Sequence, residues 1–164
     1  MAIISATLVT EGILLSQGRA ISDLRQVVKR QLTLASEFYV SEVKQRTPVG
    51  VFNNLRDSWD YRYDDQEQQS TIAPRAEYAL AVELGRKPGK GIPIEPLTLW
   101  VRRKIGVSDE RKAKSIAFLI SRKAKRQGIK GQHFAGDTFT AVLPVLNNTF
   151  ISPIGALVVK ALGG

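Results

Sequence analysis

The strongest constraint on the fold of this chain is the stretch 21–46, which carries the periodicity of one long amphipathic helix. Apolar side chains recur there at intervals of three and four residues, the spacing that gathers side chains on one face of an α-helix. They are Leu24, Val27, Val28, Leu32, Ala35, Phe38, Tyr39 and Val43. The helix is predicted to end at Thr47, because Pro48 follows and the residue before a proline disfavours the α region.

A β-hairpin is predicted directly after this helix. From Leu55 to Tyr63, aromatic residues alternate with polar ones, which is the pattern of a strand with one buried face. The aromatic side chains are therefore expected to pack in the core. Residues 69–73 form the returning strand, and Pro74 stops the ladder because it has no N–H to donate.

Further helices are predicted on both sides of a glycine-rich loop. A short one covers Ala76–Leu84, and Gly85 stands where a helix-ending glycine belongs. Longer ones are predicted over Pro93–Ile105, Asp109–Gln127 and Gly136–Phe150. Pro144 lies inside the last of these and is expected to kink or shorten it. Near the N-terminus, alternation over Thr7–Leu15 favours an edge strand.

Together these elements predict an α+β fold, in which a small antiparallel β-sheet packs with a long N-terminal helix and further helices. The length of 164 residues fits a single domain, with a lead-in at 1–20, a core at 21–150 and an apolar C-terminal arm at 151–164. The arm is too apolar for a free solvated end, so it either folds back as a final strand or docks on another subunit. Its apolar residues include Ile154, Leu157, Val158 and Val159.

The composition excludes several classes of protein. The chain has no cysteine, so it has no disulfide, no cysteine-based zinc site and no thiol nucleophile. A single histidine, His133, does not make a convincing transition-metal site. The first residues lack the basic region of a signal peptide. No apolar run is expected to reach the roughly 20 residues that a membrane helix needs.

Positive charge is concentrated in the stretch 86–130. This segment holds 14 Lys and Arg residues and three acidic ones, so it carries +11, whereas the rest of the chain carries −2 of the total of +9. Such segments attract polyanions or acidic partner surfaces. Either they hold phosphates without sequence preference, or they form a solvated helix face. The candidate contact residues are Arg102, Arg103, Lys104, Arg122, Lys123, Lys125 and Arg126.

Acidic residues gather around the predicted hairpin, between Asp57 and Glu67. A two-metal nuclease needs carboxylates that converge on one face, whereas here only Asp60 and Asp64 are expected to share a strand face. A solvated turn is the preferred interpretation, with one functional variant in which the acidic loop docks on a neighbouring basic surface. We therefore assign no catalytic, cofactor-binding or metal-binding residue.

Three short motifs, in order along the chain, resemble the "gene product ten"-like family of tailed-phage neck and tail-completion proteins. The turn T-P-V-G contains Pro48 and Gly50, and the L-R-x-S pattern places Leu55, Arg56 and Ser58. The pattern Y-A-x-x-V-E-x-G places Tyr78, Glu83 and Gly85. The resemblance extends over residues 22–150. These positions are typical of turns, caps and packing, and an ion pair between Glu83 and Arg56 is one hypothesis that they suggest.

The resemblance implies a structural, non-enzymatic virion protein at the head–tail junction, with a fold like that of tail-terminator and neck proteins. It implies a homo-oligomeric ring, with six subunits as the first choice and twelve as the second. Its partners would be adjacent neck, connector and tail-tube proteins, with genomic DNA passing through the ring and no membrane or cofactor. Assembly would take place in the host cytoplasm. The alternative is a nucleic-acid-binding protein without sequence preference that uses residues 86–130.

Overall fold

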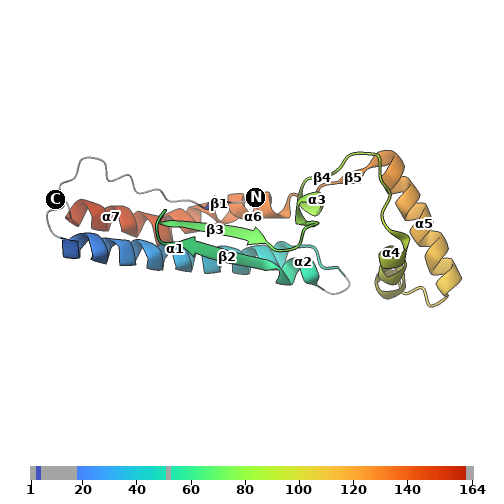
Figure 1. The fold of residues 1–164 in the computed structure, drawn as a ribbon, viewed down its shortest axis with the longest axis horizontal. Helices are drawn as coiled ribbons and strands as arrows, with labels where there is room; N and C mark the ends of the chain where they lie inside the picture. The colour runs from blue at the N-terminus through green and yellow to red at the C-terminus, as the bar shows by residue number, and fades with distance from the viewer. Residues whose placement is uncertain (1–2, 5–17, 51–52, 162–164) are drawn as a thin grey trace.

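The computed structural model describes residues 3–4, 18–50 and 53–161. The long helix α1 (Gly18–Arg46) lies beside the C-terminal helical segments, which run in the opposite direction (Figure 1). These segments are α6 (Phe134–Val145), the π-helical η2 (Leu146–Ile151) and α7 (Ser152–Ala161). The predicted helix at 21–46 is therefore confirmed, and it begins slightly earlier.

A small antiparallel sheet packs on this helix pair. Its strands are β1 (Ile3–Ile4), β2 (Trp59–Asp64) and β3 (Gln69–Pro74), in the order β1-β3-β2. Register places Tyr61 opposite Ile72 across the hairpin. The α+β class is thus confirmed. The strand predicted over Thr7–Leu15 falls outside the described residues.

The main core lies between the sheet and the two long helical segments. Tyr39 of α1 is fully buried, and its ring contacts Trp59 and Phe139 edge-on at centroid distances of 6.4 and 6.1 Å. Phe134 contacts Trp59 in the same manner at 6.2 Å. Edge-to-face pairs of this kind add about 0.5–1.5 kcal/mol each to the free energy of area burial. Trp59 is thus buried in the core as predicted, whereas Tyr61 and Tyr63 are only partly buried against it.

A helical hairpin projects from one end of this body (Figure 1). It consists of α4 (Ile94–Trp100), the π-helical η1 (Val101–Ile105) and α5 (Glu110–Gln127). A two-stranded ribbon of β4 (Gly85–Arg86) and β5 (Ile129–Lys130) connects it to the body. The hairpin has its own core, in which Leu97 and Val101 pack on Ala113 and Ala117. We call residues 92–127 the basic hairpin.

Three local expectations are corrected by the structure. The strand predicted from Leu55 begins only at Trp59, because α2 (Asn54–Asp57) forms a helical turn in which the Ser58 hydroxyl donates to the Leu55 carbonyl. The short helix before Gly85 is α3 (Ala79–Glu83). The C-terminal arm is the helix α7 rather than a strand. The regular helix α6 ends at Val145, directly after Pro144 and short of the predicted Phe150, and the chain continues as the π-helical η2.

The C-terminal helical stretch also corrects the expectation about apolar length. Phe134–Val159 is a continuous helical run of 26 residues, and a window of 18 residues within it has a mean hydropathy of 1.6, so the run is long and apolar enough to cross a membrane. Length and composition alone do not distinguish such a segment from a helix that packs inside a soluble protein, and one side of this helix packs on α1.

Candidate interaction surfaces

The first two motifs build the junction between α1 and the hairpin. The buried Thr47 hydroxyl donates to the Val43 carbonyl at 2.6 Å and accepts the indole N–H of Trp59 at 2.9 Å. Leu55 is buried in the core. Arg56 forms an ion pair with its neighbour Asp57 at 3.3 Å. Pro48 and Gly50 lie in the turn that follows α1. These residues therefore lie in the core, in a turn and in a surface ion pair at this junction.

Glu83 caps a helix instead of pairing with Arg56. Its carboxylate accepts the backbone N–H groups of Ala135 at 2.9 Å and Gly136 at 3.0 Å, in the first turn of α6. The residue before that helix, His133, has φ +51° and provides no side-chain cap. A carboxylate at a helix N-terminus satisfies N–H groups that otherwise lack partners and interacts favourably with the helix dipole. The predicted Glu83–Arg56 pair is thus wrong.

Gly85 is required by the close approach of the two ribbon strands. Its φ is +77°, and a Cβ at this position would collide with the backbone of Ile129 and Gly131. The next backbone contacts continue this tight pairing, because Gln132 donates to Val82 and His133 donates to Glu83, each at 3.0 Å. The third motif therefore positions the base of the basic hairpin and the start of α6 at once, while its Tyr78 is exposed.

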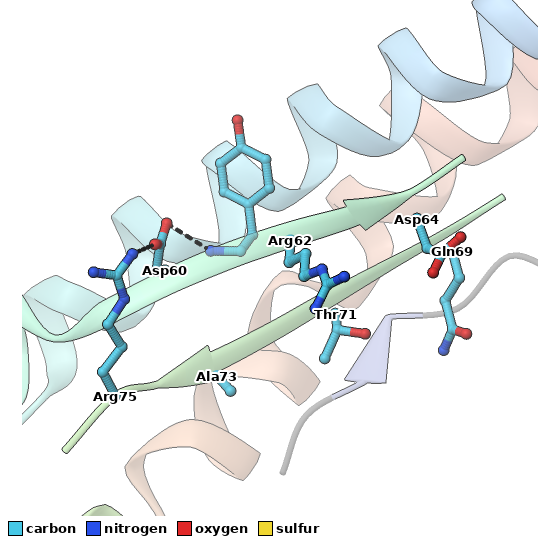
Figure 2. A pocket seen from close by; sticks show the side chains of 8 residues that line it. Asp60, Arg62, Asp64, Gln69, Thr71, Ala73 and Arg75 are labelled. Atoms are coloured by element: carbon cyan, nitrogen blue, oxygen red, sulfur yellow. Dashed lines mark hydrogen bonds and ion pairs between the residues drawn. The ribbon is translucent and has the colours of Figure 1, made fainter. Parts of the chain in front are cut away.

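The outer face of the sheet is polar and forms a shallow open pocket (Figure 2). Its lining residues are Asp60, Tyr61, Arg62, Asp64, Gln69, Thr71, Ala73 and Arg75. The carboxylate of Asp60 pairs with the Arg75 guanidinium and accepts the N–H of Tyr61, and these hydrogen bonds lower its pKa. Asp64 accepts the N–H groups of Gln66 and Glu67, which lowers the pKa of its carboxyl group as well.

The hairpin acids are thus engaged in turns and ion pairs. Asp65, in the turn between β2 and β3, pairs with Lys29 of α1 at 2.8 Å. Over the described ranges of the chain, no group of three or more His, Cys, Asp or Glu side chains lies close enough to hold a metal ion. The structure therefore brings no convergent carboxylates together at the position that the nuclease alternative would need.

The basic candidates all lie on the surface of the basic hairpin. Arg102, Arg103 and Lys104 are exposed on η1, and two shallow pockets lie against the hairpin's basic side chains. On α5 the exposed candidates are Arg122, Lys123, Lys125 and Arg126. From Arg111 to Lys130 the chain has eight basic residues and no acid. In the part of the chain that the structure describes, Lys114 is the one basic side chain of α5 with an ion pair, to Glu110.

Sequence reasoning missed an apolar pair in the middle of this basic face. Phe118 and Leu119 of α5 are each 56% exposed. Helical spacing could have found them, because α5 buries Ala113, Ala117 and Ala124, and Phe118 and Leu119 fall outside that stripe. Trp100 of α4 is also exposed on this hairpin. The hairpin therefore combines basic and large apolar groups on its surface.

The apolar tail residues divide into two groups. Ile154 is 4% exposed and packs against Val28 and Leu32 of α1, with Val158 partly buried beside them. Leu157 and Val159 of α7 are 41% and 62% exposed. Thus Ile154 stabilises the fold of the chain itself, whereas Leu157 and Val159 remain accessible to a partner.

One comparison with known proteins gives a match. Residues 17–85 match the family model described as "Bacteriophage HK97-gp10, putative tail-component". No curated protein and no solved structure matches the chain. The family description points to a structural role in a phage particle and away from catalysis. The matched segment runs from the start of α1 through the β-hairpin to Gly85, and over these residues the chain is confirmed as similar to the gene product ten-like family of phage tail components.

Proposed function

We propose that this protein is a structural subunit of the phage head–tail junction, acting in the neck, in tail completion or as a tail terminator. The observation that carries the proposal is the match of residues 17–85 to a family of phage tail components. That segment includes α1, the β2–β3 hairpin and α3, which together form much of the body. The subunits would assemble into a ring that joins the tail to the head connector, with six copies as the first choice and twelve as the second.

The shape of the molecule supports assembly through unlike surfaces. The body is elongated, and the basic hairpin extends from one end of it (Figure 1). Contacts between two different surfaces of identical subunits generate rings when the rotation closes. The basic hairpin and the exposed apolar residues of α7 provide such surfaces. The proposed contact residues are Arg102, Arg103, Lys104, Arg122, Lys123, Lys125, Arg126, Leu157, Val158 and Val159.

The proposed neighbours are the connector, other neck proteins and the tail tube, and genomic DNA would pass through the ring. The protein would then reside at the neck or the tail top of the virion, after assembly in the host cytoplasm. A membrane has no role in this proposal, and the apolar face of α6, η2 and α7 would instead lie against protein.

Electron microscopy of particles from a phage with this gene disrupted tests the proposal. Separate DNA-filled heads and finished tails are the expected result, and supplying the intact gene from a plasmid should restore joined virions. Tails of uncontrolled length would assign the protein to tail termination within the same proposal. Normal, joined virions from the disrupted phage would overturn it.

One observation favours a second candidate function, which is binding of nucleic acid without sequence preference. The helix α5 of the basic hairpin and the strand β5 after it carry eight basic residues and no acidic one between Arg111 and Lys130. A protein that neutralises several phosphates loses affinity steeply as salt rises, because bound counterions are released. Titration of duplex DNA at several salt concentrations measures this slope. Strong, steeply salt-dependent binding would favour this function, whereas a neck protein should bind free DNA weakly.

A further inference from the structure

We propose that the outward face of α5 binds the acidic β2–β3 turn of a second copy of this chain. The face consists of Phe118 and Leu119 at its centre, with Arg111, Arg122 and Arg126 around them, and we call it the α5 face. This inference rests on the proposed function, because it names the contact between neighbouring subunits of the ring. The group that binds to the α5 face is a carboxylate-rich turn, and each identical subunit carries one.

The geometry of α5 gathers these five residues on one side. The helix buries Ala113, Ala117, Ser121 and Ala124 against α4 and the loop before it. Residues that are seven or eleven positions apart lie nearly above one another on a helix. Phe118 and Arg122 therefore align with Arg111, and Arg126 aligns with Leu119, on the side away from the buried stripe. All five side chains are exposed.

The composition of the α5 face is that of a protein–protein contact. Interfaces are enriched in aromatic residues and arginine, and their strongest contacts lie near the centre with polar groups around them. Here a phenylalanine and a leucine, each 56% exposed, occupy the centre, and the arginines surround them. A surface that binds only duplex phosphates gains nothing from an apolar centre, because phosphate contacts come from basic and polar groups. A protein partner is therefore favoured over DNA.

The same chain carries the complementary charge. Residues 57–67 contain five acidic residues and one arginine. In the turn itself, Asp65 keeps an exposed carboxylate while paired with Lys29, and Glu67 is exposed. Asp64, at the start of the turn, accepts the N–H groups of Glu67 and Gln66, and these hydrogen bonds hold the pKa of its carboxyl group below its usual value. Opposite charges on two partners steer encounter and fix register.

The two surfaces lie far apart in the molecule (Figure 1). β2 begins beside α2 and β3 leads back towards α3 and the ribbon, so the turn that joins β2 to β3 lies at the end of the sheet away from the basic hairpin (Figure 1). The α5 face of one chain therefore contacts the turn of another chain rather than its own. Such a head-to-tail contact repeats around a ring.

Charge reversal and charge exchange test this contact. The variant Arg122→Glu/Arg126→Glu is expected to weaken self-association at least tenfold in analytical ultracentrifugation, and to lose complementation of a phage with the gene disrupted. Asp65→Lys/Glu67→Lys is expected to do the same. Combining the four changes in one chain should restore association and tail joining, since both surfaces then carry exchanged charges. Phe118→Ser/Leu119→Ser should also weaken association without unfolding the chain, because both side chains are exposed.

A matched control makes the same change in net charge as Arg122→Glu/Arg126→Glu at another place on the surface. Lys87→Glu/Lys90→Glu changes two exposed lysines of the loop before α4 and should leave association within twofold of the wild type. Variants of the α5 face that associate and complement like this control would overturn the inference. So would a wild-type chain that stays monomeric while its charge-reversal variants still join tails, or a loss of DNA binding in those variants with association unchanged.

The outcomes separate this inference from the function on which it rests. Unjoined heads and tails in the disrupted phage, together with full complementation by Arg122→Glu/Arg126→Glu, would sink the α5 contact and keep the junction role. Normal virions from the disrupted phage would remove the junction role. In that case the exchange of charges on purified protein still reports whether the two surfaces bind each other.

Discussion

The carboxylate of Glu83 accepts the backbone N–H of Ala135 at 2.9 Å, across 52 positions of the chain. This contact joins the segment that matches a phage tail-component family to the first turn of α6, which lies outside the match. The intervening residues form the ribbon and the basic hairpin. Glu83 therefore fixes the point at which the chain leaves the hairpin and returns to the body.

We expect Glu83→Ala to lower the free energy of unfolding by about 1–2 kcal/mol, as loss of a helix cap does. The change leaves two N–H groups of α6 without their acceptor. Glu83→Gln keeps one carbonyl acceptor, so it should cost less, about 0.5–1 kcal/mol. Urea unfolding followed by circular dichroism measures both values. The exposed Glu77→Ala serves as the control, and an equal effect of the two alanine variants would contradict the assignment of a cap.

Arg56→Ala should act independently of Glu83. Arg56 pairs with Asp57 on the surface, and exposed ion pairs of this kind contribute about 0–1 kcal/mol. The double variant Arg56→Ala/Glu83→Ala should therefore show the sum of the two single effects within about 0.5 kcal/mol. A larger coupling energy in the double-mutant cycle would restore the pairing that the structure rejects.

Thr47→Val should destabilise the junction between α1 and the β-hairpin by about 1–3 kcal/mol, because it leaves the buried indole N–H of Trp59 without an acceptor. The shape of the side chain is nearly unchanged, so packing contributes little. Thr47→Ser keeps the hydroxyl and should cost less than the valine change. Thermal or urea unfolding compares the two. Equal stability of the valine variant and the wild type would show that this hydrogen bond contributes nothing.

Stability should fall as the pH rises from about 10 to 12, in part through Tyr39. Burial and the nearby Glu83 carboxylate raise the pKa of Tyr39 to about 12, whereas an unfolded tyrosine titrates near 10. The folded chain thus keeps this proton over a range in which the unfolded chain has lost it. The stabilising contribution is complete below pH 10 and is lost as the pH passes through the folded value.

Tyr39→Phe removes this part of the pH dependence. The variant also loses the hydrogen bond from the Tyr39 hydroxyl to the Ala135 carbonyl, so it should be less stable near neutral pH by about 1–2 kcal/mol. The difference in the free energy of unfolding between the wild type and Tyr39→Phe should become smaller towards pH 12. Tyr63→Phe is the comparison for the loss of stability near neutral pH. This variant loses no hydrogen bond, because the Tyr63 hydroxyl is buried without a partner among the described residues. A constant difference across the pH range would contradict the prediction.

Three glycine substitutions separate steric collision from backbone strain. Gly85→Ala combines φ +77° with a collision against the ribbon, so it should cost more than about 3 kcal/mol or disrupt the base of the hairpin. At Gly106 φ is +81° and an added Cβ would meet open space. Gly106→Ala should therefore lower the free energy of unfolding by about 1–2 kcal/mol through backbone strain alone. Gly50→Ala has open space and should be nearly neutral. Urea unfolding that ranks them in a different order would contradict the role given to Gly85.

Regular elements were the most predictable part of this fold, because their signals are local. The periodicity over 21–46 and over Asp109–Gln127 placed two long helices almost as the structure has them. The second begins at Glu110, because the Asp109 side chain caps it by accepting the N–H groups of Arg111 and Lys112. The helical form of the C-terminal arm was not predicted, because it depends on the packing of Ile154 on α1.

The candidate surfaces were predictable in composition and unpredictable in arrangement. The concentration of charge at 86–130 is a property of the sequence. Its projection from the body on a two-stranded ribbon depends on the close backbone contacts of Gly85 with Ile129 and Gly131, which lie far along the chain. The exposure of Phe118 and Leu119 depends on which side of α5 the short α4 covers.

The sequence by itself determined the long helices, the hairpin strands, the basic segment and the likeness to a phage tail component. Each of these depends on neighbouring residues, through periodicity, capping or composition. Only the tertiary structure decided that Glu83 caps α6, that Ile154 is internal while Leu157 and Val159 are exposed, and that the acidic turn lies at the end of the sheet away from the basic hairpin. These relationships depend on contacts between residues far apart in the chain. Which side chains of a helix are buried is decided by the element that packs against each of its faces.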